Sequence, residues 1–169
     1  RYERALALRA PLAAAAPDDV DRRRALAATH VRLGDVKGLE GYANLGDTPG
    51  ALAHYRRALA EREAVAAARP DDPEARAALA RTLSHAGILA RVTGDVPAAV
   101  AYGRRAVALH AALAAGDTAS ATHRGDLVAA QGRATADTLA KNGRPTRRMH
   151  VERLDERALG ELLMHFMLE

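Results

Sequence analysis

The sequence of 169 residues contains no cysteine, no tryptophan and a single phenylalanine. Without cysteine the chain has no disulfide, no thiolate zinc site and no cysteine nucleophile. Aromatic residues make up only 3% of the chain, although 49% of it is hydrophobic and alanine supplies much of that share. A core that is rich in alanine and poor in aromatics suits closely packed helices better than a sandwich or a barrel.

Lysine is almost absent as well. It occurs only at Lys37 and Lys141, so 23 of the 25 basic residues are arginine. The 21 acidic residues are interspersed with them, and the formal net charge is +4. Because no basic stripe with interleaved aromatics is present, we expect a solvated surface of mixed charge and no nucleic-acid partner.

Long apolar runs are also missing, since none approaches the roughly 18 residues that a membrane span needs. The start of the chain shows no signal peptide. We therefore expect a cytoplasmic protein with no membrane partner. Arg1 and Glu169 both lie within predicted helices, so we expect the chain to be a fragment at both ends.

What the sequence does contain is an internal repeat. Residues 51–67 align with residues 99–115 at an offset of 48. Five residues recur identically: Ala51, Arg56, Arg57, Ala58 and Ala60 recur as Ala99, Arg104, Arg105, Ala106 and Ala108. The beginning of the chain fits the same frame at an offset of 53, because five extra residues lie near 37–46. An insertion of this kind is tolerated best in a corner between helices.

Each repeat unit is predicted to be a pair of helices. Residues 72–92 begin with Asp-Pro and place Leu79, Leu83, Ala86 and Ala90 on one face. Gly94 provides the turn, and Pro97 lies in the first turn of the next helix, where its missing N–H is not needed. An antiparallel helix pair cannot bury its apolar face alone, so we expect such pairs to stack. The predicted class is all-α.

The spacing of small residues resembles the tetratricopeptide repeat (TPR) family. Its pattern is carried by Gly87, Gly94, Ala99 and Ala106, and in the preceding repeat by Gly34, Gly46, Ala51, Tyr55 and Ala58. The long period is most similar to repeat arrays attached to bacterial serine/threonine kinases, although no kinase motif is present. The resemblance covers about residues 1–124 and implies a short right-handed solenoid.

The same resemblance implies a groove that binds a protein or peptide. The residues that would face it by repeat position are Arg81, Ser84, Ile88 and Arg91. Family members that clamp a C-terminal carboxylate have Lys and Asn there, so Ser84 and Ile88 do not predict that ligand. The two arginines favour an acidic partner, whereas a groove without a ligand is the alternative.

The repeat pattern fades after residue 124. A third repeat would place glycine at 135 and 142, where the chain has Thr135 and Asn142. One amphipathic helix is expected to end at Asn142, before Gly143 and Pro145. A short strand or irregular segment over 146–153 and a helix from Asp155 are predicted to follow.

The stretch 125–169 resembles the C-terminal region of bacterial glucose-6-phosphate isomerase. Two segments of the sequence carry this resemblance: DLVAAQGRATADTLAKNGRPTRR and LDERALGELLMHFMLE. The family's catalytic lysine would follow beyond Glu169, and its base glutamate and ring-opening histidine would lie upstream, where this chain carries repeats. We therefore expect an isomerase-like fragment without the family's catalytic residues, joined to the repeats near His123–Leu127.

A search for chemistry in the rest of the chain predicts no catalytic, cofactor or metal site. None of the seven histidines has the spacing of a zinc motif, and the glycine-rich stretch 34–46 lacks the P-loop ending. Asp71 and Asp72 are read as a helix start rather than as paired acids, and Arg147 and Arg148 as a solvated turn.

The sequence thus favours a non-catalytic interaction scaffold. The alternative is a fragment of glucose-6-phosphate isomerase, the enzyme of aldose–ketose isomerisation of sugar phosphates in glycolysis and gluconeogenesis, which we expect to be inactive in this chain. The apolar face of the last helix is predicted either to cap the array or to drive self-association. The residues of that face are Leu159, Leu162, Leu163 and Phe166.

Overall fold

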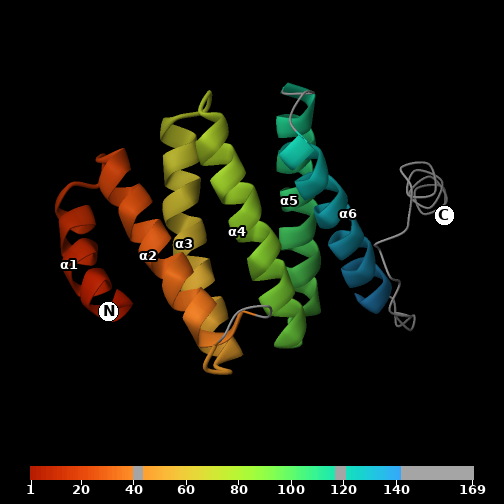
Figure 1. The fold of residues 1–169 in the computed structure, drawn as a ribbon, viewed down its shortest axis with the longest axis horizontal. Coiled ribbons are helices and arrows are strands. Elements are labelled where there is room, and N and C mark those ends of the chain that lie inside the picture. The colour runs from red at the N-terminus through yellow and green to blue at the C-terminus, as the bar shows by residue number, and fades with distance from the viewer. Residues whose placement is uncertain (40–43, 117–120, 142–169) are drawn as a thin grey trace.

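The computed structural model describes residues 1–39, 44–116 and 121–141 (Figure 1). This part of the chain is all helical and contains no strand, which confirms the predicted all-α class. The helices in chain order are α1 (Tyr2–Ala15), α2 (Val20–Gly38), α3 (Thr48–Ala68), α4 (Pro73–Val92), α5 (Val96–Gly116) and α6 (Ala121–Lys141).

The helices pack in chain order, each against the next, and α6 also reaches α4. Figure 1 shows them standing side by side from α1 to α6. Helices α2 and α3 form the first pair, and α4 and α5 form the second. Because short connections join neighbours, each pair is antiparallel, as the sequence predicts. No helix of the described part is both long and apolar enough to cross a membrane.

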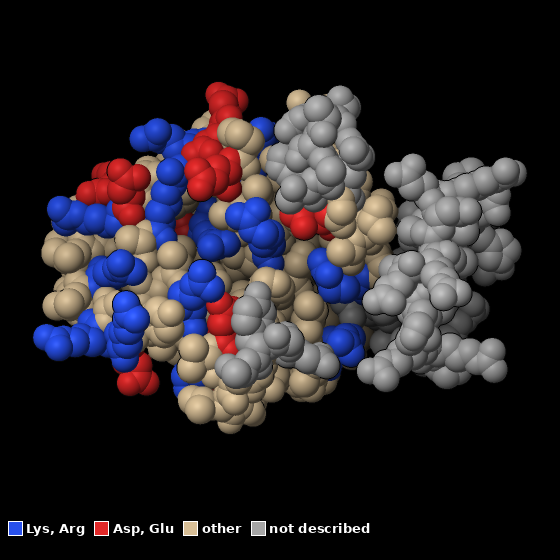
Figure 2. Space-filling view, viewed as in Figure 1, with Lys and Arg blue, Asp and Glu red and all other residues tan. Residues whose placement is uncertain are grey.

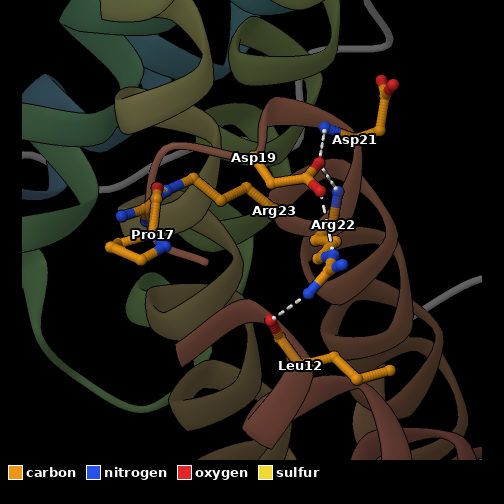
Figure 3. A network of polar contacts seen from close by, with 6 residues as sticks. All are labelled: Leu12, Pro17, Asp19, Asp21, Arg22 and Arg23. Carbon is orange, nitrogen blue, oxygen red and sulfur yellow. Dashed lines mark hydrogen bonds and ion pairs between the residues drawn. The ribbon is translucent and has the colours of Figure 1, made fainter. Parts of the chain in front are cut away.

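The start of α2 shows how the sequence sets a helix boundary. The Asp19 carboxylate accepts hydrogen bonds from the backbone N–H groups of Asp21 and Arg22, at 3.1 Å each. Arg22 also donates to the carbonyl of Leu12 at 3.1 Å, which ties α2 to α1 (Figure 3). An aspartate at the N-cap satisfies backbone donors that have no partner within the helix.

The start of α4 repeats this arrangement 53 residues later. Asp72 accepts from the N–H groups of Glu74 and Ala75 at 2.9 and 3.1 Å. The interpretation of Asp71 and Asp72 as a helix start is therefore confirmed. Asp72 also forms an ion pair with Arg24 of α2, so the cap contributes to the contact between the two helix pairs.

Two glycines form the corners that the sequence predicts. Gly46 and Gly94 have φ values of +74° and +84°, in the left-handed region that side chains other than glycine rarely adopt. Pro97 is the second residue of α5, where a missing N–H costs no helical hydrogen bond. The insertion near 37–46 spans the end of α2 and the connection to α3, of which residues 40–43 are outside the description.

A side-chain contact between consecutive pairs recurs at the same offset of 53. Arg9 on α1 donates to the Ala25 carbonyl and to the Thr29 hydroxyl on α2, at 3.3 and 2.6 Å. The equivalent Arg62 on α3 donates to the Ala78 carbonyl and the Thr82 hydroxyl on α4. The repeat seen in the sequence is thus also a repeat of tertiary contacts.

The core runs through the middle of the row of helices. All four residues predicted for the inner face of α4 are buried, with exposed fractions from 0% to 6%. They belong to one cluster that includes Leu52, Tyr55 and Leu59 from α3, and Ala99 and Ala106 from α5. The largest fully buried side chain of the described residues is Tyr55.

Two predictions on the C-terminal part fall on residues outside the description. These are the strand or irregular segment at 146–153 and the helix from Asp155, with its apolar face. The predicted helix before Asn142 is confirmed as α6. This helix begins at Ala121 and continues without a break through residue 125, where the isomerase-like segment was expected to start.

Candidate functional site: the face of α2, α4 and α6

The four residues predicted to face a groove all lie on α4, but their exposure differs. Arg81 and Arg91 are exposed, and Ile88 is partly buried. Ser84 is buried at 6% exposure, and its hydroxyl has no hydrogen-bond partner among the described residues. The two arginines are therefore accessible to a partner, whereas Ser84 lies within the packing.

Three polar side chains from three helices lie next to these residues of α4 and contact one another. We call them the polar bridge: Asp35 of α2, Tyr55 of α3 and His85 of α4. The Tyr55 hydroxyl donates to Asp35 Oδ1 at 2.6 Å and lies 3.2 Å from His85 Nδ1. The rings of Tyr55 and His85 meet edge to face, with centroids 5.7 Å apart. The bridge connects α2 with α4 through α3.

The polar bridge sets the tautomer of His85. A phenol has one proton to donate, and that of Tyr55 goes to the Asp35 carboxylate. Towards His85, the Tyr55 oxygen therefore accepts, and His85 Nδ1 carries the hydrogen. In a neutral ring the other nitrogen, Nε2, then carries the lone pair.

Arginines surround this histidine. Burial lowers the pKa of His85, and the charges of Arg133, Arg62 and Arg81 lower it further, whereas Asp35 acts in the opposite direction. The neutral ring is therefore the form that the site favours. Arg32 also contacts the polar bridge, because its Nη1 lies 3.4 Å from Asp35 Oδ2.

Three of these residues occupy one repeat position. Arg32, His85 and Arg133 are related by the offsets of 53 and 48, and they lie on α2, α4 and α6. The first helix of each pair thus presents a basic or titratable side chain at the same place. Figure 2 shows Lys and Arg spread across the face of the molecule in the view of Figure 1, with acidic side chains between them.

Sequence reasoning missed the polar bridge. It tested the seven histidines only for the spacing of a zinc motif, and it noted Tyr55 only as one residue of the repeat pattern. The signal that would have found His85 was its alignment with Arg32 and Arg133. The link from Asp35 to His85 could not be read from the sequence, because 50 residues separate them and Tyr55 connects them only in the folded protein.

A second pair of histidines lies between α2 and α3. His30 and His54 approach with their Nδ1 atoms 3.1 Å apart. Burial, with the neighbouring His54 and Arg57, lowers the pKa of His30 to about 4. Burial also lowers the pKa of His54, and Lys37 and Arg57 contribute. Two nitrogens at this distance share one hydrogen, so the pair is stable only when at least one ring is neutral.

The described residues offer no further site of a recognisable kind. Within residues 1–39, 44–116 and 121–141, no three His, Asp or Glu side chains come together in a way that could hold a metal ion. Comparison with known proteins adds no assignment: no family model, no curated protein and no solved structure matches this chain.

Proposed function

We propose that this chain is a protein-interaction scaffold. Its helix pairs would stack as a short right-handed solenoid of the TPR type, and the face of α2, α4 and α6 would bind an acidic segment of a partner protein. The observation that carries the proposal is the repeat position shared by Arg32, His85 and Arg133, which places a basic or titratable side chain once on each of these helices.

Two structural features support a repeat array. The contacts of Arg9 and Arg62 join consecutive units in the same way, and each helix packs against its neighbours in the chain. Helix α6 packs on α5 and reaches α4, the position expected for the first helix of a third unit. Stacked units of this kind present a continuous surface for an extended or helical partner.

The charge of the face supports the choice of partner. Arg81 and Arg91 are exposed on α4, and Arg32 has an exposed side chain on α2. Guanidinium groups bind carboxylates with two parallel hydrogen bonds. A segment rich in glutamate or aspartate could therefore contact several helices at once.

The isomerase alternative has no observation in its favour among the described residues. The described part of that match, residues 125–141, belongs to α6, which packs on α5 as part of the helical row. The remaining residues of the match, 142–169, are outside the description.

The proposal can be tested by fluorescence anisotropy with a labelled glutamate-rich peptide. We expect a dissociation constant of roughly 1–100 μM, or about −5 to −8 kcal/mol, and no binding of a lysine-rich peptide. Arg81→Glu should weaken binding at least about tenfold, which corresponds to about 1.4 kcal/mol.

Arg104→Glu is the matched control, because Arg104 is an exposed arginine of α5 and the charge change is the same. It should leave the affinity nearly unchanged. Equal losses in the two variants would mean that the peptide responds only to net charge, and the proposed face would be wrong.

A further inference from the structure

His85 occupies an unusual position on the face of α2, α4 and α6. Its Nδ1 is engaged by the Tyr55 hydroxyl, which in turn is held by Asp35. The orientation of the ring is thus fixed from the interior of the protein. The ring is only partly buried, and Nε2 is the nitrogen that remains for a ligand.

Charged groups on four helices act on His85. Asp35 belongs to α2, Arg62 to α3, Arg81 to α4 and Arg133 to α6. Three of the four are cations, so adding a proton to His85 places a fourth positive charge among them. Tyr55 contacts His85 as well, through the hydroxyl that donates to Asp35.

We propose that His85 is a proton-coupled contact for the acidic partner: the imidazole gains a proton at Nε2 when a carboxylate binds, so that acidification strengthens binding. This inference rests on the proposed function of the face. The added proton comes from solvent. The Nδ1–H group of His85 remains hydrogen-bonded to the Tyr55 oxygen before and after binding.

The physical reason is that the partner reverses the local balance of charge. A carboxylate beside Arg81 and Arg133 offsets the repulsion that opposes the imidazolium, and it accepts a hydrogen bond from the new Nε2–H. The pKa of His85 therefore rises on binding. By linkage, a complex that holds one more proton than the free protein becomes tighter as the pH falls.

The lowered pKa of His85 determines both the direction in which affinity changes with pH and the pH range of that change. The free protein has a His85 pKa below the ordinary value for histidine. Affinity should rise as the pH falls from the alkaline side towards that lowered value. Below it the gain should level off, because His85 is then charged in the free protein as well.

The test is the anisotropy titration with the glutamate-rich peptide at several pH values and constant ionic strength. Between about pH 8 and 6 the affinity of the native chain should increase roughly three- to tenfold. The peptide's glutamates stay ionised over this range. Calorimetry in two buffers of different ionisation enthalpy should show net proton uptake.

Two variants separate His85 from the other histidines. His85→Gln keeps a polar side chain that can meet the Tyr55 hydroxyl but does not titrate, so its affinity should be nearly independent of pH. His54→Gln removes a histidine that lies between α2 and α3, and it should keep the full pH dependence.

The outcomes distinguish the two proposals. Peptide binding that is independent of pH, or a pH dependence that survives in His85→Gln, would overturn the role of His85 and leave the proposed face intact. A peptide that fails to bind at every pH would overturn the proposed function, and the role of His85 with it.

Discussion

The two helix pairs use equivalent positions in different ways. In the first pair, a Cβ added to Gly34 of α2 would lie 2.6 Å from the Tyr55 ring, so the aromatic packs directly on the glycine. In the second pair Gly103 stands at the position of Tyr55. A Cβ on Gly87 would lie 3.5 Å from the Ala99 carbonyl and 3.8 Å from the Gly103 nitrogen, so backbones approach instead. A shared spacing of glycines therefore supports two kinds of packing.

The pairs also differ in what they bury between their helices. His30 and His54 meet in the first pair, whereas Leu83 and Tyr102 occupy the equivalent positions in the second. The first pair therefore contains titratable groups in its packing, and the second is apolar there. Protonation of His30 and His54 should therefore affect the stability of the first pair at this position, where the second pair has no histidine.

The largest effect is expected for Tyr55→Ala. Tyr55 is fully buried and holds Asp35, so removal of its ring leaves a cavity and takes a partner from a buried carboxylate. We expect a loss of about 3–5 kcal/mol in the free energy of unfolding, measured by urea denaturation. Tyr102→Ala is the control: Tyr102 is only partly buried, and its removal should cost less than half as much.

A smaller effect is expected at the contact between pairs. Arg62→Met keeps an unbranched side chain but removes two charged hydrogen bonds to α4, and should cost about 2–3 kcal/mol. Arg9→Met removes the equivalent contact at the exposed start of the array. It should cost less than about 1 kcal/mol, because solvent can replace those bonds. Equal losses would contradict the view that burial separates the two contacts.

Acid should weaken the first pair through His30. The folded-state pKa of His30 is about 4, below the ordinary value of 6.5, so below pH 6.5 the unfolded chain gains a proton that the folded chain does not. Lowering the pH from 8 to 5 should therefore cost about 2 kcal/mol of stability from His30 alone. Unfolding curves across this range measure the loss.

His30→Leu is the matched variant, since leucine occupies the equivalent position 83. It should remove this part of the pH dependence while keeping the helix pair folded. An unchanged slope of stability against pH in the variant would show that His30 does not carry the effect.

The smallest effect tests the glycine contacts directly. Gly34→Ala would press a methyl group into the Tyr55 ring, and the overpacking should outweigh the gain in helix propensity, for a net loss of about 1–2 kcal/mol. Gly87→Ala meets only ordinary contacts and should be neutral or stabilising by up to about 1 kcal/mol. Similar shifts of the unfolding midpoint for both variants would contradict the proposed difference in glycine packing between the two pairs.

Local signals account for what could be predicted from the sequence. The corner at Gly94, the cap at Asp72 and the inner face of α4 each depend on residues close together in the chain, and each is confirmed. The recurring contact of Arg62 and the polar bridge depend on side chains 16 to 50 positions apart. Such contacts become visible only when helix rotation and packing are known.

The candidate face was predicted in part. Repeat position assigned Arg81, Ser84, Ile88 and Arg91 to a groove; in the structure Arg81 and Arg91 are exposed on α4, but Ser84 is buried. His85 was overlooked because a single histidine on an amphipathic helix has many ordinary roles. The role proposed for His85 depends on Asp35 and Tyr55, which engage Nδ1 and leave Nε2 for a ligand.

The central claim is that α2, α4 and α6 form the binding face. The most direct test is amide chemical-shift mapping by NMR during titration with the glutamate-rich peptide. We predict the largest shifts around Arg32, Arg81 and Arg133, with α3 and α5 changing little at exposed positions such as Arg104. Shifts concentrated on α3 and α5, or no specific shifts at saturating peptide, would contradict the claim.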